Sequence, residues 1–419
     1  MYSKKIFIAL VLLISIFQLA VSQNNTNSPY TRFGYGDVTE STPAELRGMG
    51  GVSITNYSKN TINPVNPASY SSVDSLTFMF DVATGFRYSR FSDKTGASSN
   101  TFNGNLEYIT LRLPLGKSWG FSAGLLPYSF SGYAFTQSDS LTMLVYPGEA
   151  EKKIGYTQSF IGNGGFYQVY SGLSFRAFNH ISLGANVYYM FGDINNYRTL
   201  VESNSSSSST VYNNKIHASD FRLRYGLQLF NTFNKRHTVT LGLIYENKTK
   251  LNGSFSETLN DSVLGAVGGS ELPQLFGAGL SYNLDDKLTI GMDYKMQSWG
   301  NSLFFGHKDS LVNSSSFSLG AEYIPNPRGR KMSERIRYRI GLNTSNPYYK
   351  VGTQTLPNNF GLSLGIGIPM RDNFTNKISY INAALEYGKI GSNSMLREDY
   401  LKLTISASFN ELWFFKRKL

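Results

Sequence analysis

The sequence predicts an all-β fold: a transmembrane antiparallel β-barrel of about 14 strands with an N-terminal plug inside its lumen. Three observations predict it. The 419 residues include 29 Phe, 28 Tyr and 40 Gly, yet only 16% are charged. Many segments after residue 22 alternate between apolar and polar side chains, and none is apolar enough for a transmembrane helix. Short and long connections alternate between these segments, as they do in bacterial outer-membrane barrels.

The chain begins like an exported protein. Two lysines precede an apolar run at 6–17, and small residues follow it. This pattern is typical of a secretory signal peptide, so we expect residues 1–22 to be removed before Gln23. A retained anchor is the alternative, but the run is short for a bilayer span. The absence of cysteine excludes a lipoprotein anchor, a disulfide framework and a thiolate metal site.

The alternation assigns two faces to each strand. From Phe221 to Leu229 every odd position is apolar, while the even positions hold Arg, Gly or Gln. The same period of two recurs at 181–189, 288–296, 336–342 and 401–409. One face is therefore apolar and the other is wet. Soluble sandwiches also alternate, so this period favours a membrane barrel only modestly.

The connections between strands favour the barrel more strongly. We expect strands at 76–90, 103–115, 119–134, 166–178, 181–199, 210–231, 236–256, 274–284, 287–303, 313–325, 335–350, 358–371, 375–390 and 399–412. Short connections fall at 116–118, 178–180, 231–235 and 285–286, with a longer exception at 325–334. The others run to about thirty residues near 135–165, and short periplasmic turns opposite long outer loops are typical of transmembrane barrels. Residues 75–415 are thus assigned to the barrel and 416–419 to a short periplasmic tail.

Residues 23–74 lack strand periodicity and precede the first strand. They contain several glycines and the stretch INPVNPASY at 62–70. Each proline fixes φ and moves the preceding residue out of the helical region, which predicts a rigid turn. Because the side chains of fourteen strands do not fill the lumen, we interpret 23–74 as a plug. A periplasmic tail is the alternative.

Several short motifs carry a family resemblance. They are RGMGGVSI at 47–54, NPVNPASY at 63–70, GLLPYSF at 124–130, GFYQVYSGLSF at 165–175 with ISLGANVYYMFGDI at 181–194, and the closing FNELWFFKRKL. Together they resemble the FadL-type outer-membrane transporters (OMPP/FadL/TodX-like barrels), particularly the branch abundant in Bacteroidetes. The resemblance implies a fourteen-stranded barrel in the bacterial outer membrane with an N-terminal hatch. It also implies that hydrophobic molecules leave through a side opening at a kink in the third strand.

The resemblance assigns a hatch motif. Asn66, Pro67 and Ala68 match the Asn-Pro-Ala element of the family. The chain departs from the family in a second pair, Asn63-Pro64, which we include in the motif. It also lacks a long run of apolar loop residues to capture ligand, which leaves the substrate class open.

The third predicted strand contains a candidate kink at Gly124 and Pro127. Pro127 has no backbone donor, so it breaks a ladder bond or lies at a bulge. Because an unmade backbone bond in lipid costs several kcal/mol, the proline suggests a local opening in the wall. The alternative is that Pro127 lies above the membrane, where water satisfies its neighbours.

Charged side chains are expected on the wet faces. This set is Arg112, Arg176, Arg222, Arg224, Glu246, Asp293, Glu322, Arg337, Arg339 and Glu386. We expect them to pair across strands and to hold the plug, although arginines also grip carboxylate ligands. The four histidines have no metal-site spacing, and no Ser-His-acid constellation is evident, so neither metal, cofactor nor enzymatic activity is expected. The net charge of +11 does not indicate nucleic-acid binding in an exported barrel.

Three functions compete at this point. The first is passive uptake of a hydrophobic or amphipathic small molecule across the outer membrane, with hatch-gated lateral exit through the kinked third strand. The second is a non-transporting role, in which the barrel is a subunit or docking partner of an outer-membrane secretion or assembly complex. A lipid-hydrolysing barrel is third, without a supporting constellation. The expected partners are outer-membrane lipid, a hydrophobic ligand and, in the second case, other outer-membrane proteins.

Overall fold

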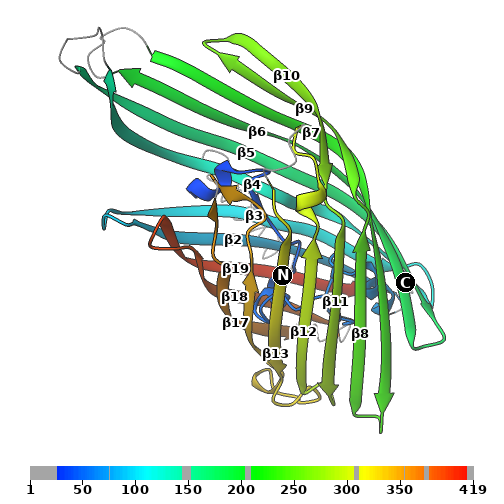
Figure 1. The fold of residues 1–419 in the computed structure, drawn as a ribbon. Coiled ribbons are helices and arrows are strands. Elements are labelled where there is room, and N and C mark those ends of the chain that lie inside the picture. Colours follow the sequence, from blue (N-terminus) through cyan, green and yellow to red (C-terminus); the bar gives the residue numbers. More distant parts are fainter. Residues whose placement is uncertain are drawn as a thin grey trace, which may run out of the picture.

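The computed structural model describes residues 26–74, 76–143, 152–202, 209–305, 311–352, 354–371 and 377–412. The predicted signal peptide and the predicted tail at 416–419 lie outside these ranges. Within them the chain forms a closed, all-β barrel of fourteen antiparallel strands, which confirms the predicted fold class (Figure 1). None of the described helices has the length and apolar character needed to cross a membrane.

The wall strands follow one another around the ring in chain order. They are β2 (Thr77–Asp93), β3 (Ser98–Pro114), β4 (Trp119–Met143), β5 (Lys152–Ala177), β6 (Ile181–Glu202), β7 (Ser209–Phe233), β8 (His237–Glu246), β11 (Leu275–Leu284), β12 (Leu288–Gln297), β13 (Ser314–Tyr323), β14 (Arg337–Ser345), β17 (Asn359–Arg371), β18 (Ile378–Gly391) and β19 (Leu396–Leu412). The first and last strands pair from Thr77 opposite Leu412 to Asp93 opposite Leu396. This pairing closes the ring and leaves no sheet edge there.

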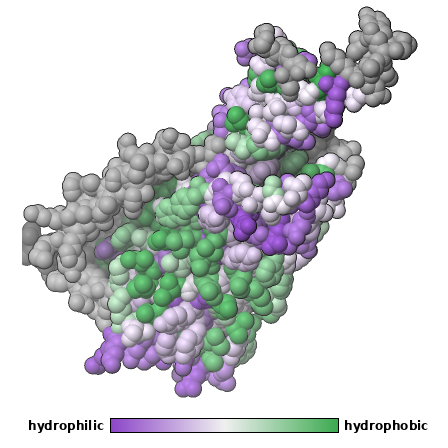
Figure 2. All heavy atoms as spheres, turned by 90° about the vertical axis from the view of Figure 1, so that its left-hand side faces the viewer, coloured by the Kyte–Doolittle hydropathy of each residue, from purple (hydrophilic) through white to green (hydrophobic). Residues whose placement is uncertain are grey.

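The predicted faces agree with the observed burial. On β7, Phe221 is 61% exposed, whereas Arg222 and Arg224 point inward and are each only 8% exposed. Exposed outward side chains on the neighbouring strands, such as Leu183 and Leu241, continue the apolar surface. Figure 2 shows the side of the barrel that lies at the left of Figure 1, where hydrophobic side chains form a green band with purple hydrophilic side chains below it. The wall therefore has the outward apolar belt that a transmembrane barrel requires.

The short connections are tight hairpins at one end of the barrel. Asp285 and Asp286 join β11 to β12 with φ values of 52° and 56°, which is the conformation of a two-residue turn matched to the twist of a hairpin. The exception is the connection from β13 to β14, residues 324–336, which contains the 3₁₀ turn η4 (Ser333–Arg335).

Two sequence-based boundaries were wrong. The predicted long loop near 135–165 is largely strand, because β4 and β5 stay paired from Trp119 opposite Phe175 to Met143 opposite Lys152. A further hairpin, β9 (Thr249–Leu259) and β10 (Ser262–Leu272), extends the sheet beyond β8 and pairs with β7. Both segments are polar or glycine-rich, so their strands are formed by backbone pairing with neighbours and show little apolar alternation.

The N-terminal segment, residues 26–74, lies against the inner face of the wall and appears in blue in Figure 1. It contains η1 (Pro29–Arg32), β1 (Asp37–Val38), α2 (Ala44–Arg47) and η2 (Pro67–Ser72). The approach is so close that a Cβ added at Gly341 would collide with the backbone of Gly50, and one at Gly184 with the backbone of Pro67. Other wall glycines in the same situation are Gly120, Gly242, Gly320 and Gly365, and a Cβ at Gly226 would collide with the side chains of Asn66 and Pro67. The division into a plug at 23–74 and a barrel at 75–415 stays a prediction.

Aromatic side chains from the N-terminal segment, from η3 (Trp299–Asn301) and from the connection after β14 pack together. Tyr35 contacts Trp299 of η3 with ring centroids 5.7 Å apart, and Trp299 contacts Tyr348 at 4.6 Å. Tyr348 lies between β14 and the short pair β15 (Lys350–Val351) and β16 (Gln354–Thr355). This apolar cluster fills the space between the long-loop end of the wall and the N-terminal segment.

Candidate functional site

The two Asn-Pro pairs form a clamp around the peptide units of Ser53 and Ile54. Asn63 Nδ2 donates to the Ser53 carbonyl at 2.7 Å, and Asn66 Nδ2 donates to the Ile54 carbonyl at 2.7 Å. Asp293 Oδ2 on β12 accepts from the N–H of Ser53 at 2.6 Å and from that of Ile54 at 2.8 Å. All four backbone groups are thus satisfied inside the lumen, which is the condition for burying them at low cost.

The rest of the predicted hatch motif is bonded to the wall or to itself. The Pro64 carbonyl accepts from Asn186 Nδ2 at 3.0 Å and from the Tyr188 hydroxyl at 2.9 Å, both on β6. Asn66 Oδ1 accepts from the Ala68 N–H at 3.1 Å and caps η2, with Pro67 as its first residue. Asn63 and Asn66 thus make the same kind of bond, each to the carbonyl of one of two adjacent residues, Ser53 and Ile54.

A gap in the wall separates the upper parts of β3 and β4. β3 pairs with β4 only from Ile109–Pro114 to Gly120–Leu125. Beyond the Ile109–Leu125 pair, both strands continue, β3 back to Ser98 and β4 on to Met143. Within the described residues, no pairing joins β3 at 98–108 to β4 at 126–143. We call this gap the lateral seam. Gly124 is in the last paired stretch below it, and Pro127 lies at its lower corner.

Pro127 adjoins a bulge. The register of β4 against β5 shifts between Pro127 and Ser129, which leaves Tyr128 as the extra residue. Tyr128 points into the lumen, where its ring lies 5.1 Å from the Arg222 guanidinium. A proline without an N–H is compatible with this place, because the edge of β4 has lost its β3 partner here.

The N-terminal segment takes the place of β3 along the seam. β1 pairs with β4, with Asp37 opposite Phe130 and Val38 opposite Ser129. The Thr39 N–H donates to the Tyr128 carbonyl at 2.9 Å, and Gly132 N–H donates to Thr31 Oγ1 at 3.0 Å. The backbone of β4 thus finds its partners in a segment that is not part of the wall.

The predicted lumen charges lie in two compact groups. Glu246 pairs with Arg222 at 2.6 Å and also with Arg224, and Arg222 donates to Gln168. Across the lumen wall, Glu322 pairs with Arg339 at 2.6 Å and with Arg337 at 3.4 Å. Each glutamate is shared by two arginines, so removing the glutamate would leave two uncompensated guanidinium charges, whereas removing one arginine would leave the glutamate paired.

Three other predicted charges behave differently. Arg112 donates to the Ser58 and Lys59 carbonyls of the N-terminal segment, at 3.1 and 2.6 Å. Glu386 accepts from the Tyr400 hydroxyl at 2.6 Å. Arg176 lies at the short-turn end, where it donates to the Lys117 carbonyl, and it has no carboxylate partner in the described part of the chain.

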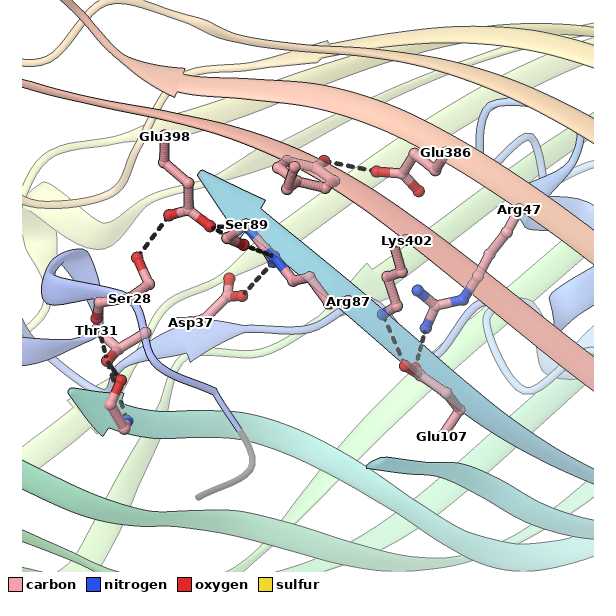
Figure 3. Close-up of polar contacts among 12 residues, drawn as sticks. Ser28, Thr31, Asp37, Arg47, Arg87, Ser89, Glu107, Glu386, Glu398 and Lys402 are labelled. Atoms are coloured by element: carbon pink, nitrogen blue, oxygen red, sulfur yellow. Dashed lines mark hydrogen bonds and ion pairs between the residues drawn. The ribbon is translucent and has the colours of Figure 1, made fainter. Parts of the chain in front are cut away.

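Sequence reasoning missed the charges that tie the N-terminal segment to the first and last strands. Figure 3 shows Arg47 beside Glu107 and Lys402, and Asp37 beside Arg87 and Glu398. Arg47 and Lys402 each lie 2.7 Å from Glu107, and Arg87 lies 2.8 Å from Glu398. The even positions of β19 were a usable signal for Glu398 and Lys402, since that strand alternates. Glu107 gave no such signal, because it lies at a bulge of β3 where the register shifts, and it is buried together with the adjacent Tyr108.

Two carboxylates of the N-terminal segment differ in their electrostatics. Burial alone would raise the pKa of Glu40, but Lys295 at 2.5 Å holds that pKa below its ordinary value. Burial raises the pKa of Glu45, which Arg339 at 3.7 Å offsets only in part. Glu40 thus anchors the segment to β12 through an ion pair. Glu45 is packed against the wall, and the loss of its hydration there is compensated only in part.

A cavity of about 340 Å³ lies between the N-terminal segment and the wall. Val38, Thr39 and Tyr128 line it at the seam, and Arg224 and Lys295 line it toward the lumen charges. Its lining mixes aromatic rings with hydroxyl, amide and charged groups. Among the described residues, no group of three metal-binding side chains is present.

A family model described as BamG matches residues 2–419. The chain belongs to the BamG family. No curated protein matches this BamG-family chain significantly.

Solved structures share the fold of this BamG-family chain. A Pseudomonas aeruginosa FadL homologue has a TM-score of 0.58 at 14% identity, over 91% of this chain and 100% of that one. The Pseudomonas putida toluene transporter TodX has a TM-score of 0.57 at 16% identity, over 89% and 99% of the two chains. The Ralstonia pickettii toluene transporter TbuX has a TM-score of 0.57 at 17% identity, over 87% and 97%. The predicted FadL-type fold is confirmed, and the predicted Bacteroidetes branch stays a prediction.

Proposed function

We propose that this protein is an outer-membrane barrel for passive uptake of hydrophobic or amphipathic small molecules. The lateral seam carries the proposal. It is a stretch of wall where two adjacent strands are unpaired and a luminal segment supplies the missing partners. The similar solved structures include proteins described as toluene transporters, which supports this reading of a shared fold.

The route follows from the position of the cavity. A molecule in the cavity is separated from the seam by Val38 and Thr39 of the N-terminal segment. A small displacement of β1 would connect the cavity with the lipid-facing side of the wall. Because the cavity has a mixed lining, we infer a cargo with an apolar body and one polar group. In this proposal residues 26–74 act as the hatch, and Gly124 and Pro127 mark the lateral opening.

A disulfide across the seam tests the proposal. Val38 and Ser129 are directly paired, and paired strand residues lie at distances that a disulfide accepts. The chain has no cysteine of its own, so Val38→Cys/Ser129→Cys creates a single pair. We expect the oxidised form to take up benzyl alcohol, a probe with an apolar body and one polar group, at least tenfold more slowly than its reduced form.

The matched control places the same bond within the wall. Thr232 and Thr238 are paired on β7 and β8, so Thr232→Cys/Thr238→Cys should transport benzyl alcohol equally well when oxidised and reduced. Equal uptake by the two redox forms of the seam variant would refute lateral exit. A loss in both variants would point to a general effect of oxidation.

A second function is favoured by a different observation. The N-terminal segment is held by ion pairs at several points, including Arg47–Glu107 and Glu40–Lys295. A lumen fixed in this way suits a barrel that is a subunit or docking partner of an outer-membrane secretion or assembly complex. Native mass spectrometry of the protein extracted gently from its own membrane tests this alternative. A stoichiometric protein partner with no bound apolar molecule would favour it over uptake.

A further inference from the structure

The short-turn end of the barrel is strongly basic. Five described connections lie there: 115–118, 178–180, 234–236, 285–287 and 324–336. Together they carry eight Lys and Arg residues but only three Asp and Glu residues. Figure 2 shows hydrophilic side chains gathered at this lower end, below the apolar band. This excess of positive charge is not used by the seam or by the hatch.

Half of these basic residues lie in residues 324–336, which we call the basic loop. Its conformation is fixed by its own hydrogen bonds, because Asn326 N–H donates to the Glu334 carbonyl at 2.8 Å and Gly329 N–H to the Asn326 carbonyl at 3.0 Å. Glu334 uses its carboxylate to accept from the Lys331 N–H at 3.2 Å. The acidic residue of the loop therefore shapes its backbone and does not neutralise its cations.

Most cations of the basic loop lack an acidic partner. Arg328 pairs with Asp285 of the neighbouring turn at 2.9 Å. Arg330 and Lys331 are exposed, and no carboxylate of the described chain pairs with either. Arg335 at the base of the loop is only 9% exposed, has no ion pair in the same part of the chain, and its Nε has no hydrogen-bond partner. A buried guanidinium without a counter-charge is costly, so this loop is suited to receive an anion.

The position of the basic loop selects the kind of anion. Tyr323 and Tyr338 are paired at the base of the loop and point outward, with exposures of 44% and 46%. Outward tyrosines at the end of an apolar belt mark the membrane interface. A loop that starts directly after this pair lies at the level of the lipid headgroups, where basic side chains attract anionic lipids.

We propose that the basic loop binds the headgroup phosphates of anionic phospholipids in the leaflet at the short-turn end. Arg330 and Lys331 supply the accessible charges. An acidic protein would not require the tyrosine pair beside the loop, so a lipid fits the observations better. The site would hold lipid against β13 and β14, on a part of the wall distant in sequence from the seam.

Native mass spectrometry of the full-length, detergent-solubilised protein tests the proposal. Phosphatidylglycerol is titrated against the same concentrations of phosphatidylcholine. We expect the wild type to prefer phosphatidylglycerol, and Arg330→Gln/Lys331→Gln to lose about 25-fold of this preference, because each basic residue near an anionic surface contributes about fivefold. Arg330→Gln alone should lose about fivefold. The control Arg90→Gln/Lys94→Gln removes the same charges from exposed positions at the opposite end, and should keep the wild-type preference.

The outcomes are separable. Heat-modifiable migration in gels verifies that each variant is a folded barrel. An unchanged preference in the double variant, or an equal loss in the control, would overturn the proposal. Inorganic phosphate is the second probe. If phosphate binds the wild type but not the double variant, and phosphatidylglycerol binds neither, the site takes free phosphate and the lipid assignment is wrong.

Discussion

The clamp around Ser53 and Ile54 gives the sharpest prediction about the N-terminal segment. Asp293→Ala removes the acceptor of two buried N–H groups. Each buried donor left unsatisfied costs about 1–3 kcal/mol, so the anchoring of the segment should weaken by about 2–6 kcal/mol. A loss of about 4 kcal/mol raises the detached population roughly a thousandfold. The barrel itself should persist, since wall pairing is not altered.

Limited trypsin digestion of the folded protein measures this detachment. The trypsin sites of the N-terminal segment are Arg32, Arg47 and Lys59. We expect rapid cleavage there in Asp293→Ala and slow cleavage in the wild type, while the wall strands stay intact. Asp293→Asn is the matched control, because one amide oxygen can accept the same two N–H groups that Asp293 Oδ2 accepts.

Two results would refute this reasoning. If Asp293→Ala is cleaved as slowly as the wild type, the clamp does not hold the segment. If Asp293→Asn is cleaved as fast as Asp293→Ala, the charge of Asp293 matters and its hydrogen bonds do not.

Three further predictions concern the same lumen. Gly184→Val should expose the N-terminal segment to trypsin, because the new side chain collides with its backbone, whereas Gly116→Val, with open space around it, should not. Arg222→Met should lower the stability of the barrel by about 1–3 kcal/mol, since its carboxylate partner on β8 keeps a second arginine; an unchanged heat-modifiability midpoint would contradict this. The lowered pKa of Glu40 means that its pairing with Lys295 is complete above the ordinary value of 4.5 and is lost as pH falls through the lower folded value. Conductance in planar bilayers should therefore stay constant from pH 8 to pH 5 and rise only below that range, and a rise already at pH 6 would count against the pair.

Alternation was sufficient to predict the ring of strands, because lipid and lumen impose opposite demands on successive side chains. It was insufficient where water surrounds both faces, as in β4 beyond Ala134 and in the glycine-rich β10. There the two faces of the strand carry similar side chains, so the sequence does not alternate. The strand forms because its backbone pairs with the adjacent strand.

The candidate site could be predicted only in part for a related reason. Pro127 indicated a break in the hydrogen-bond ladder, because the identity of this one residue already shows that its backbone N–H is missing. Next to Pro127, β1 takes the place of β3 as the partner of β4, and the paired residues of β1 and β4 are about ninety positions apart in the sequence. Neither of these short segments contains a pattern that predicts the pairing. Likewise, Asp293 was assigned to the lumen by its period, but its two N–H partners came from the path of another segment.

The pairing of Thr77 with Leu412 joins the beginning of the wall to its end. Closure therefore has to wait until the last strand has been made, and contacts so distant in sequence form slowly. By then the N-terminal segment must already lie within the curve of the unfinished sheet, because a completed ring of hydrogen-bonded strands offers no way in for so many buried side chains. The topology therefore implies an order of assembly, in which the N-terminal segment is positioned first and the barrel then closes around it.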